Sequence, residues 1–136
     1  MSGDEINIAE LVAQAEACRE RAYAPYSGYR VGAALLCAGG RIFCGCNVEN
    51  SSYGLTICAE RAAVGAAVSA GERAFCAIAI ASDDVPPASP CGACRQVLVE
   101  FNPGMLVVTS SPRGGQRRYI ARDLLPDYFN LVVPPP

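Results

Sequence analysis

Two short cysteine motifs constrain the fold of this chain more than any other feature of its sequence. Cys58 is followed two residues later by Glu60, and Cys91 and Cys94 follow Pro90, a residue suited to opening a helix. Three thiolates can hold one Zn²⁺ and leave the fourth coordination position to water, which is typical of a catalytic rather than a structural zinc site. We therefore expect the fold to bring two distant segments to one ion, with Glu60 nearby as an acid and base.

The residue types that are missing narrow the chemistry. The chain has 136 residues, contains no histidine, and draws all eleven of its basic residues from arginine. Ser-His-Asp triads, Cys-His nucleophile pairs and lysine Schiff bases are therefore excluded. A general base must come mainly from Asp, Glu, Tyr or Cys side chains, and a soft metal site must use thiolates.

Composition predicts a single domain over residues 1–136. A hydrophobic content of 51% and a charged content of 18% suit a compact fold with one core. The net charge of −2 gives no support to a nucleic-acid-binding surface. We interpret the late arginines as a solvated face or an intersubunit contact, and they are Arg113, Arg117, Arg118 and Arg122.

The sequence also predicts a cytoplasmic location. Its first residues lack a basic region followed by an apolar core, and no run of about 18 apolar residues is present to span a bilayer. We expect no membrane partner and reduced thiols, so the eight cysteines are read as metal ligands or buried thiols before disulfides.

Hydrophobic periodicity and turn residues predict alternating helices and strands. The order strand, helix, strand, helix, strand indicates the α/β class, as a three-layer α-β-α sandwich with a mixed sheet of about five strands. The predicted elements are a helix over 6–23, a hairpin of strands over 29–37 and 41–47, a helix over 56–70, a strand over 74–81, a helix over 91–101, a strand over 105–109 and a short edge strand over 116–120.

Both cysteine motifs are predicted to open helices. Cys91 and Cys94 would lie on one face of a first turn, where free N–H groups and partial positive charge favour thiolates. A zinc ion with three thiolates carries one net negative charge, which weakens its ability to acidify water. The two helix dipoles and Arg61, next to Glu60, are the available compensation.

Two other interpretations of these residues stay open at this point. A closed structural Cys₄ zinc site would need a fourth thiol, and a glutamate two residues from a ligand would then have no use. The adjacent pair Asp83-Asp84 is interpreted as a solvated loop rather than a catalytic pair. The cysteines available as a fourth ligand, otherwise small buried hydrophobes, are Cys18, Cys37, Cys44, Cys46 and Cys76.

The motifs resemble those of cytidine deaminases of the small homotetrameric, three-cysteine type. The resemblance covers about residues 8–129, is specific in its motifs and is loose after Thr109. It implies one Zn²⁺ per chain and the conversion of cytidine and deoxycytidine to uridine and deoxyuridine with release of ammonia, in pyrimidine salvage. The matching stretches are Tyr26-Ser27, Val31-Gly32-Ala33-Ala34-Leu35, Gly45-Cys46-Asn47-Val48-Glu49-Asn50, Tyr53-Gly54, Thr56-Ile57-Cys58-Ala59-Glu60-Arg61 and Pro90-Cys91-Gly92-Ala93-Cys94.

The resemblance also implies roles for individual residues. Hydroxide on the zinc would attack ring C4 while Glu60 shuttles protons, and Arg61 would hydrogen-bond the ligand thiolates. The zinc ligands would be Cys58, Cys91 and Cys94. Asn47 and Glu49 would bind the ribose 3′-hydroxyl, and the Ala59 backbone would contact the pyrimidine. Tyr29 would lie over the base, where the family commonly has phenylalanine. Phe129 and Tyr53 would reach the substrate from a neighbouring subunit.

Three alternatives to this function are weighed. A deaminase acting on a cytosine-bearing antibiotic such as blasticidin S would share the zinc core, although Asn47 and Glu49 favour a ribosyl substrate. Editing of polynucleotides would need a basic groove. A structural zinc-binding interaction module would have four sulfur ligands and no exchangeable water.

Overall fold

The structure, a computed structural model, describes residues 6–131 of the chain. None of the helices in this part is long and apolar enough to cross a membrane. The elements are α1 (Ile8–Arg19), β1 (Gly32–Cys37), β2 (Ile42–Cys46), the 3₁₀ helix η2 (Tyr53–Leu55), α2 (Ala59–Ser69), β3 (Phe75–Ala81), α3 (Gly92–Phe101), β4 (Leu106–Ser111), β5 (Gly115–Ile120) and the 3₁₀ helix η3 (Ala121–Leu124).

The strands form one mixed sheet in the order β2-β1-β3-β4-β5. β3 and β4 are parallel and are joined through α3, whereas the other neighbouring pairs are antiparallel. A parallel pair requires a crossover of this kind. The predicted hairpin, the mixed five-stranded sheet and the short edge strand are confirmed, and the loop from β3 to α3 begins at the centre of the sheet.

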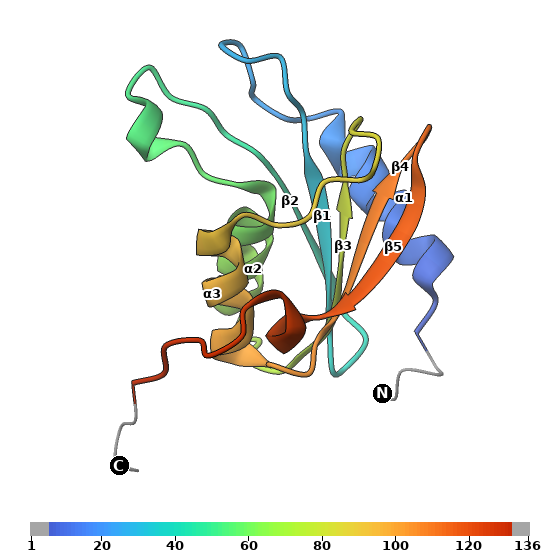
Figure 1. Cartoon of the computed structure of the whole chain (residues 1–136), viewed down its shortest axis with the longest axis vertical. Helices are drawn as coiled ribbons and strands as arrows, with labels where there is room; N and C mark the ends of the chain where they lie inside the picture. The colour runs from blue at the N-terminus through green and yellow to red at the C-terminus, as the bar shows by residue number, and fades with distance from the viewer. Residues whose placement is uncertain (1–5, 132–136) are drawn as a thin grey trace.

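Helices cover both faces of the sheet, as the predicted three-layer sandwich requires (Figure 1). Along β1, Ala34 and Leu36 pack with α1, whereas Ala33 and Leu35 pack with the α2 and α3 side. All of β1 is buried because both of its faces are covered. The apolar runs in the sequence reflect this double coverage.

Two glycines let the helices lie against the sheet. A Cβ on Gly32 would lie 2.0 Å from the Ala15 carbonyl oxygen of α1, and a Cβ on Gly45 would lie 2.4 Å from the Ala63 nitrogen of α2. Neither position can hold a side chain unless the backbone moves. The contact at Gly45 fixes α2, and with it the start of that helix, against β2.

Two predicted helices are too long because the backbone forms other bonds at their ends. The first helix ends at Arg19 rather than residue 23, and the second begins at Ala59 rather than residue 56. Tyr23 and Ile57 instead form isolated bridges with Val48. The first strand also begins three residues later than predicted. These bridges fold the segment before α2 back over the ends of β1 and β2.

Candidate active site

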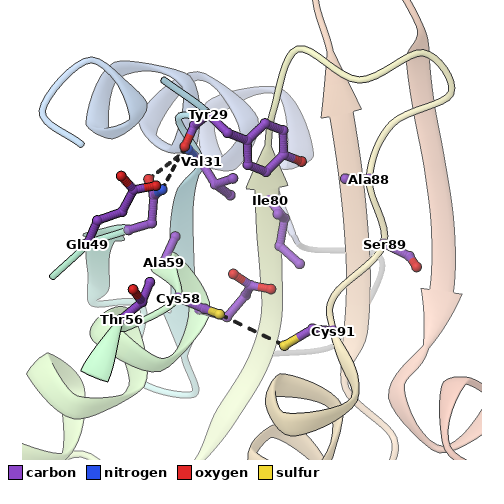
Figure 2. A pocket seen from close by; sticks show the side chains of 12 residues that line it. Tyr29, Val31, Glu49, Thr56, Cys58, Ala59, Ile80, Ala88, Ser89 and Cys91 are labelled. Carbon is purple, nitrogen blue, oxygen red and sulfur yellow. Dashed lines mark hydrogen bonds between the residues drawn. The ribbon is translucent and has the colours of Figure 1, made fainter. Parts of the chain in front are cut away.

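A cavity of about 250 Å³ lies where the starts of α2 and α3 meet the segment before β1 (Figure 2). Cys58, Ala59 and Glu60 reach it from the start of α2, and Cys91 reaches it from the start of α3. The ring of Tyr29 closes the opposite side. The two cysteine motifs therefore meet at one cavity, as their positions before two helices predicted.

Three thiols converge beside this cavity. Cys58 and Cys91 occupy the positions just before α2 and α3, and Cys94 lies in the first turn of α3. Their sulfur atoms all lie within 4.8 Å of one another, and the Cys58 and Cys91 sulfurs are 3.9 Å apart. Tetrahedral zinc with Zn–S bonds of about 2.3 Å needs sulfurs about 3.8 Å apart. The donor set therefore fits a zinc ion.

No fourth thiol joins this group among residues 6–131. The closed Cys₄ alternative therefore lacks a ligand in the described part of the chain. Cys94 is fully buried behind the cavity, whereas Cys58 and Cys91 line it. An ion held by the three sulfurs would have no sulfur at its fourth coordination position from residues 6–131. The cysteines outside the group are Cys18, Cys37, Cys44, Cys46 and Cys76.

The charges around the three thiols favour the binding of a cation. Burial raises the pKa of the Cys94 thiol far above its ordinary value, and negative charge on Glu60 and Cys58 adds to the rise. Burial also acts to raise the pKa of Cys91, but the nearby Cys94 backbone N–H and the neighbouring thiols lower it overall. A divalent ion supplies the charge that three adjacent thiolates need.

Arg61 supplies positive charge from within the first turn of α2. Its Nη2 donates a hydrogen bond to the Cys58 sulfur over 3.3 Å. This bond, the largest cause, and the nearby Cys94 thiol raise the pKa of Arg61 although burial acts to lower it, so the guanidinium stays charged. The hydrogen bond holds the Cys58 sulfur in its orientation, as supporting groups do around many metal sites.

Glu60 presents a buried carboxyl to the cavity. Only 5% of its surface is exposed, and burial raises the pKa of this carboxyl above its ordinary value. Its own backbone N–H, the Cys94 thiol and the Arg61 charge act in the opposite direction. A carboxyl whose pKa is moved toward neutrality is suited to accept a proton and then return it.

Asn47 and Glu49 line the cavity and also fix the chain segment around it. Asn47 Nδ2 donates to the Tyr29 carbonyl oxygen over 2.7 Å, and Asn47 Oδ1 accepts from the Val31 N–H over 2.9 Å. Glu49 accepts from the N–H groups of residues 26 and 27 and from the Ser27 hydroxyl. These bonds lower the pKa of Glu49, the Ser27 hydroxyl having the largest effect.

Tyr29 lines the cavity, and its hydroxyl bonds to the loop between β3 and α3. The hydroxyl donates to Asp84 Oδ2 over 2.7 Å, and burial followed by this bond raises the pKa of Tyr29 to about 12. Asp83 and Asp84 are both exposed in the loop after β3, as the expected solvated loop requires, and each also bonds to another segment of the chain. Asp83 accepts from Arg19, and Asp84 accepts from Tyr29.

Tyr53 and Phe129 do not line the cavity of this chain. They are 75% and 72% exposed. Tyr53 belongs to a second hollow that it shares with Tyr26 and Glu49, and the Phe129 carbonyl oxygen accepts from Gln96 Nε2 over 2.9 Å. A single chain therefore brings together the three thiols, Glu60, Ala59, Tyr29, Asn47 and Glu49, but leaves these two aromatic side chains in solvent.

Sequence reasoning missed Arg95, which anchors the loop before Cys91. Its guanidinium donates to the Pro90 carbonyl oxygen over 2.7 Å, to the Leu124 carbonyl oxygen over 2.8 Å and to the Ser89 hydroxyl over 2.8 Å. The only sequence signal for this role was the position of Arg95 directly after Cys94, a predicted zinc ligand. Also missed were three cavity residues outside the motifs, which are Ile80, Ala88 and Ser89, and the contribution of Thr56, which lies in a motif but had no predicted role.

Comparison with known proteins supports this description of the site. The sequence matches the family described as the cytidine and deoxycytidylate deaminase zinc-binding region over residues 6–110. It is 47% identical to a cytidine deaminase of Sporosarcina psychrophila over 126 residues, covering 92% of this chain and 93% of the relative.

Solved structures agree with the sequence comparison. The crystal structure of cytidine deaminase from Burkholderia pseudomallei has a TM-score of 0.89 and 50% identity, and the match covers 91% of this chain and all of that one. The Mycobacterium tuberculosis cytidine deaminase has a TM-score of 0.81 and 43% identity, covering 93% and 100%. With its matching sequence, fold and three-thiol site, the chain belongs to the zinc-dependent cytidine and deoxycytidylate deaminase family.

Proposed function

We propose that this protein catalyses the hydrolytic deamination of cytidine and deoxycytidine to uridine and deoxyuridine, with release of ammonia. The observation that carries the proposal is the group of three sulfurs beside buried Glu60 on one cavity wall. Three relatives that are 46–50% identical to this chain are cytidine deaminases. The cavity has a volume of about 250 Å³, slightly below the usual range of about 300–1,000 Å³ for small-molecule sites.

Two groups would carry out the chemistry, the zinc ion and the carboxyl of Glu60. When bound by Cys58, Cys91 and Cys94, zinc acts as a Lewis acid that lowers the pKa of water toward about 7. Glu60 accepts a proton from the attacking water and delivers it to ring N3 as C4 becomes tetrahedral. It then takes a second proton from the hydroxyl now on C4 and transfers it to the amino group, so that the C4 carbonyl forms as the C–N bond breaks and ammonia leaves. One carboxyl therefore acts first as base and later as acid.

Arg61 and the two helix starts support this chemistry through charge. Arg61 donates to the Cys58 sulfur, and Cys58 and Cys91 each stand at a helix N-terminus. Both features place positive potential beside the thiolates. We infer that they offset the negative charge of the ligand set and preserve the ion's ability to acidify water.

The remaining cavity residues are proposed to position the nucleoside. The Tyr29 ring would lie against the pyrimidine and the Ala59 backbone would hydrogen-bond it, while Asn47 and Glu49 would hold the ribose 3′-hydroxyl. All four residues line the cavity. Both side chains proposed for the ribose are held by bonds to residues 26–31, so they would meet the sugar in a fixed geometry.

The active form is proposed to be a homotetramer with pockets shared between subunits. Tyr53 and Leu55 in η2, and Phe129 and Leu131 near the end of the described chain, are each at least 65% exposed, and large apolar side chains exposed in this way favour an interface. Tyr53 and Phe129 would complete the pocket of a neighbouring subunit. Sedimentation analysis of the purified protein tests the assembly, and a monomer with full activity would contradict it.

A cytoplasmic role in pyrimidine salvage is proposed on chemical grounds. The Cys58 and Cys91 sulfurs lie 3.9 Å apart, so oxidation to a disulfide would destroy the metal site. Reducing compartments preserve such thiols. A nucleoside deaminase located there would supply uridine and deoxyuridine for reuse.

The decisive test is the ultraviolet absorbance of cytidine incubated with the purified protein. We expect the cytidine band to be replaced by that of uridine, the reaction to stop with a zinc chelator and to return when zinc is added. Blasticidin S and single-stranded DNA serve as alternative substrates in parallel. Turnover of either one without turnover of cytidine would overturn the proposal.

A further inference from the structure

One hydrogen bond ties the cavity wall to a loop on the far side of the site. Tyr29 belongs to the segment before β1, whereas Asp84 lies in the loop between β3 and α3. The Tyr29 hydroxyl donates to Asp84 Oδ2 over 2.7 Å. Figure 2 shows the Tyr29 ring extending over the cavity toward the loop that carries Ala88 and Ser89.

The Asp84 end of this bond is held in place by its own loop. The Asp84 backbone N–H donates to the Ser82 hydroxyl over 3.3 Å, and the Ala88 N–H donates to the same oxygen over 3.4 Å. Ser82 is almost completely buried at the end of β3, and Ala88 lines the cavity. Asp84 is therefore positioned by the same turn that shapes the cavity wall leading to Cys91.

The Tyr29 backbone is fixed independently. Its carbonyl oxygen accepts from Asn47 Nδ2 over 2.7 Å, and its N–H donates to the Ser27 hydroxyl over 2.9 Å. Only the two side-chain torsions of Tyr29 remain free, and the bond to Asp84 removes that freedom. A ring already held in its binding orientation loses less entropy when it meets a ligand.

We propose that the Tyr29–Asp84 hydrogen bond is a clasp that holds the aromatic wall of the pocket ready for the substrate, which makes Asp84 a positioning residue. This inference rests on the proposed function, in which the pyrimidine lies against Tyr29. The ring contacts the base alike in the ground state and in the transition state. Loss of the clasp therefore weakens substrate binding without slowing the chemical steps.

The test is a double-mutant cycle on the zinc-loaded enzyme with cytidine as substrate. Tyr29→Phe, Asp84→Ala and the double variant should each raise KM about three- to tenfold, with kcat within about twofold of wild type. The double variant should be no worse than the worse single variant, because both changes remove the same bond. Asp84→Asn keeps an acceptor oxygen and should restore most of the lost affinity.

Asp83→Ala is the matched control, since Asp83 is the adjacent exposed carboxylate of the same loop and pairs with Arg19. It should leave KM unchanged. The clasp is refuted if the two single variants keep wild-type KM, if their effects multiply, or if Asp83→Ala raises KM equally. Absence of wild-type turnover would instead count against the proposed function, so the two failures are distinguishable.

Discussion

The helices on the two faces of the sheet begin in different ways. α1 starts behind Asn7, whose side-chain oxygen accepts from the Glu10 N–H over 3.1 Å. α2 and α3 start behind Cys58 and Cys91, and neither of these side chains makes a capping hydrogen bond. Good N-caps contribute about 0.5–2 kcal/mol to stability. The two helices that carry the site, α2 and α3, lack this stabilisation at their N-termini.

The uncapped starts of α2 and α3 leave backbone N–H groups and partial positive charge next to the thiols. The first N–H groups of a helix have no partner inside the helix, and the dipole places partial positive charge there. A serine or asparagine cap would occupy these donors, as Asn7 does for α1. The comparison indicates that α1 is built for stability, while the starts of α2 and α3 are built to hold an ion.

The largest effect is expected from removing a zinc ligand. Cys94→Ala should abolish zinc retention and activity and lower the thermal midpoint by at least about 5 °C, because bound metal stabilises only the folded state. Cys37→Ala is the matched control, since Cys37 is equally buried but lies outside the thiol group. It should keep one zinc per chain. Metal analysis and calorimetry measure both, and equal zinc content in the two variants would contradict the assignment.

The next largest effect concerns proton transfer at the start of α2. Glu60→Gln should lower kcat at least about a hundredfold, the usual scale for loss of a general acid and base, while zinc content stays at wild-type level. Glu16→Gln, on α1 across the sheet, should keep full activity. Steady-state kinetics with metal analysis test this, and a near-normal kcat for Glu60→Gln would exclude the carboxyl as the proton carrier.

The sequence predicted the layers and the grouping of the three thiols well because both rest on local patterns. Continuous apolar runs indicated strands covered on two faces, and Cys91 and Cys94 share a helical face at their spacing of three residues. Helix boundaries were predicted less well. The bridges of Tyr23 and Ile57 with Val48 join segments that no short-range pattern connects.

Contacts between distant segments could not be predicted. The Tyr29–Asp84 bond spans 55 residues of chain, and two exposed aspartates in a proline-rich loop carry no periodic signal. Arg95 likewise bonds to the Leu124 carbonyl oxygen 29 residues away. The proposed contacts of Tyr53 and Phe129 involve a second subunit, and they stay predictions.

A smaller effect is expected from the charge that compensates the site. Arg61→Ala removes the donor to the Cys58 sulfur and should weaken zinc affinity about 10- to 100-fold, the range seen when groups supporting a metal ligand are lost. Competition with a chromophoric chelator measures the affinity. Arg41→Ala, an exposed arginine on the edge strand side, is the control and should change nothing. If Arg61→Ala kept the zinc affinity and the pH profile of wild type, the two helix dipoles alone would be enough to offset the negative charge of the thiolates.

The smallest effect tests the difference between the helix starts directly. Asn7→Ala should lower the free energy of unfolding by about 1 kcal/mol and leave zinc content and kcat unchanged, because it removes only a cap. Cys91→Ser introduces a hydroxyl suited to capping α3, yet it should lower the thermal midpoint of the zinc-loaded protein, because loss of a ligand outweighs a gained cap. If Cys91→Ser were instead more stable than wild type at saturating zinc, the start of α3 would be limited by its missing cap, and the contrast with α1 would not reflect metal binding.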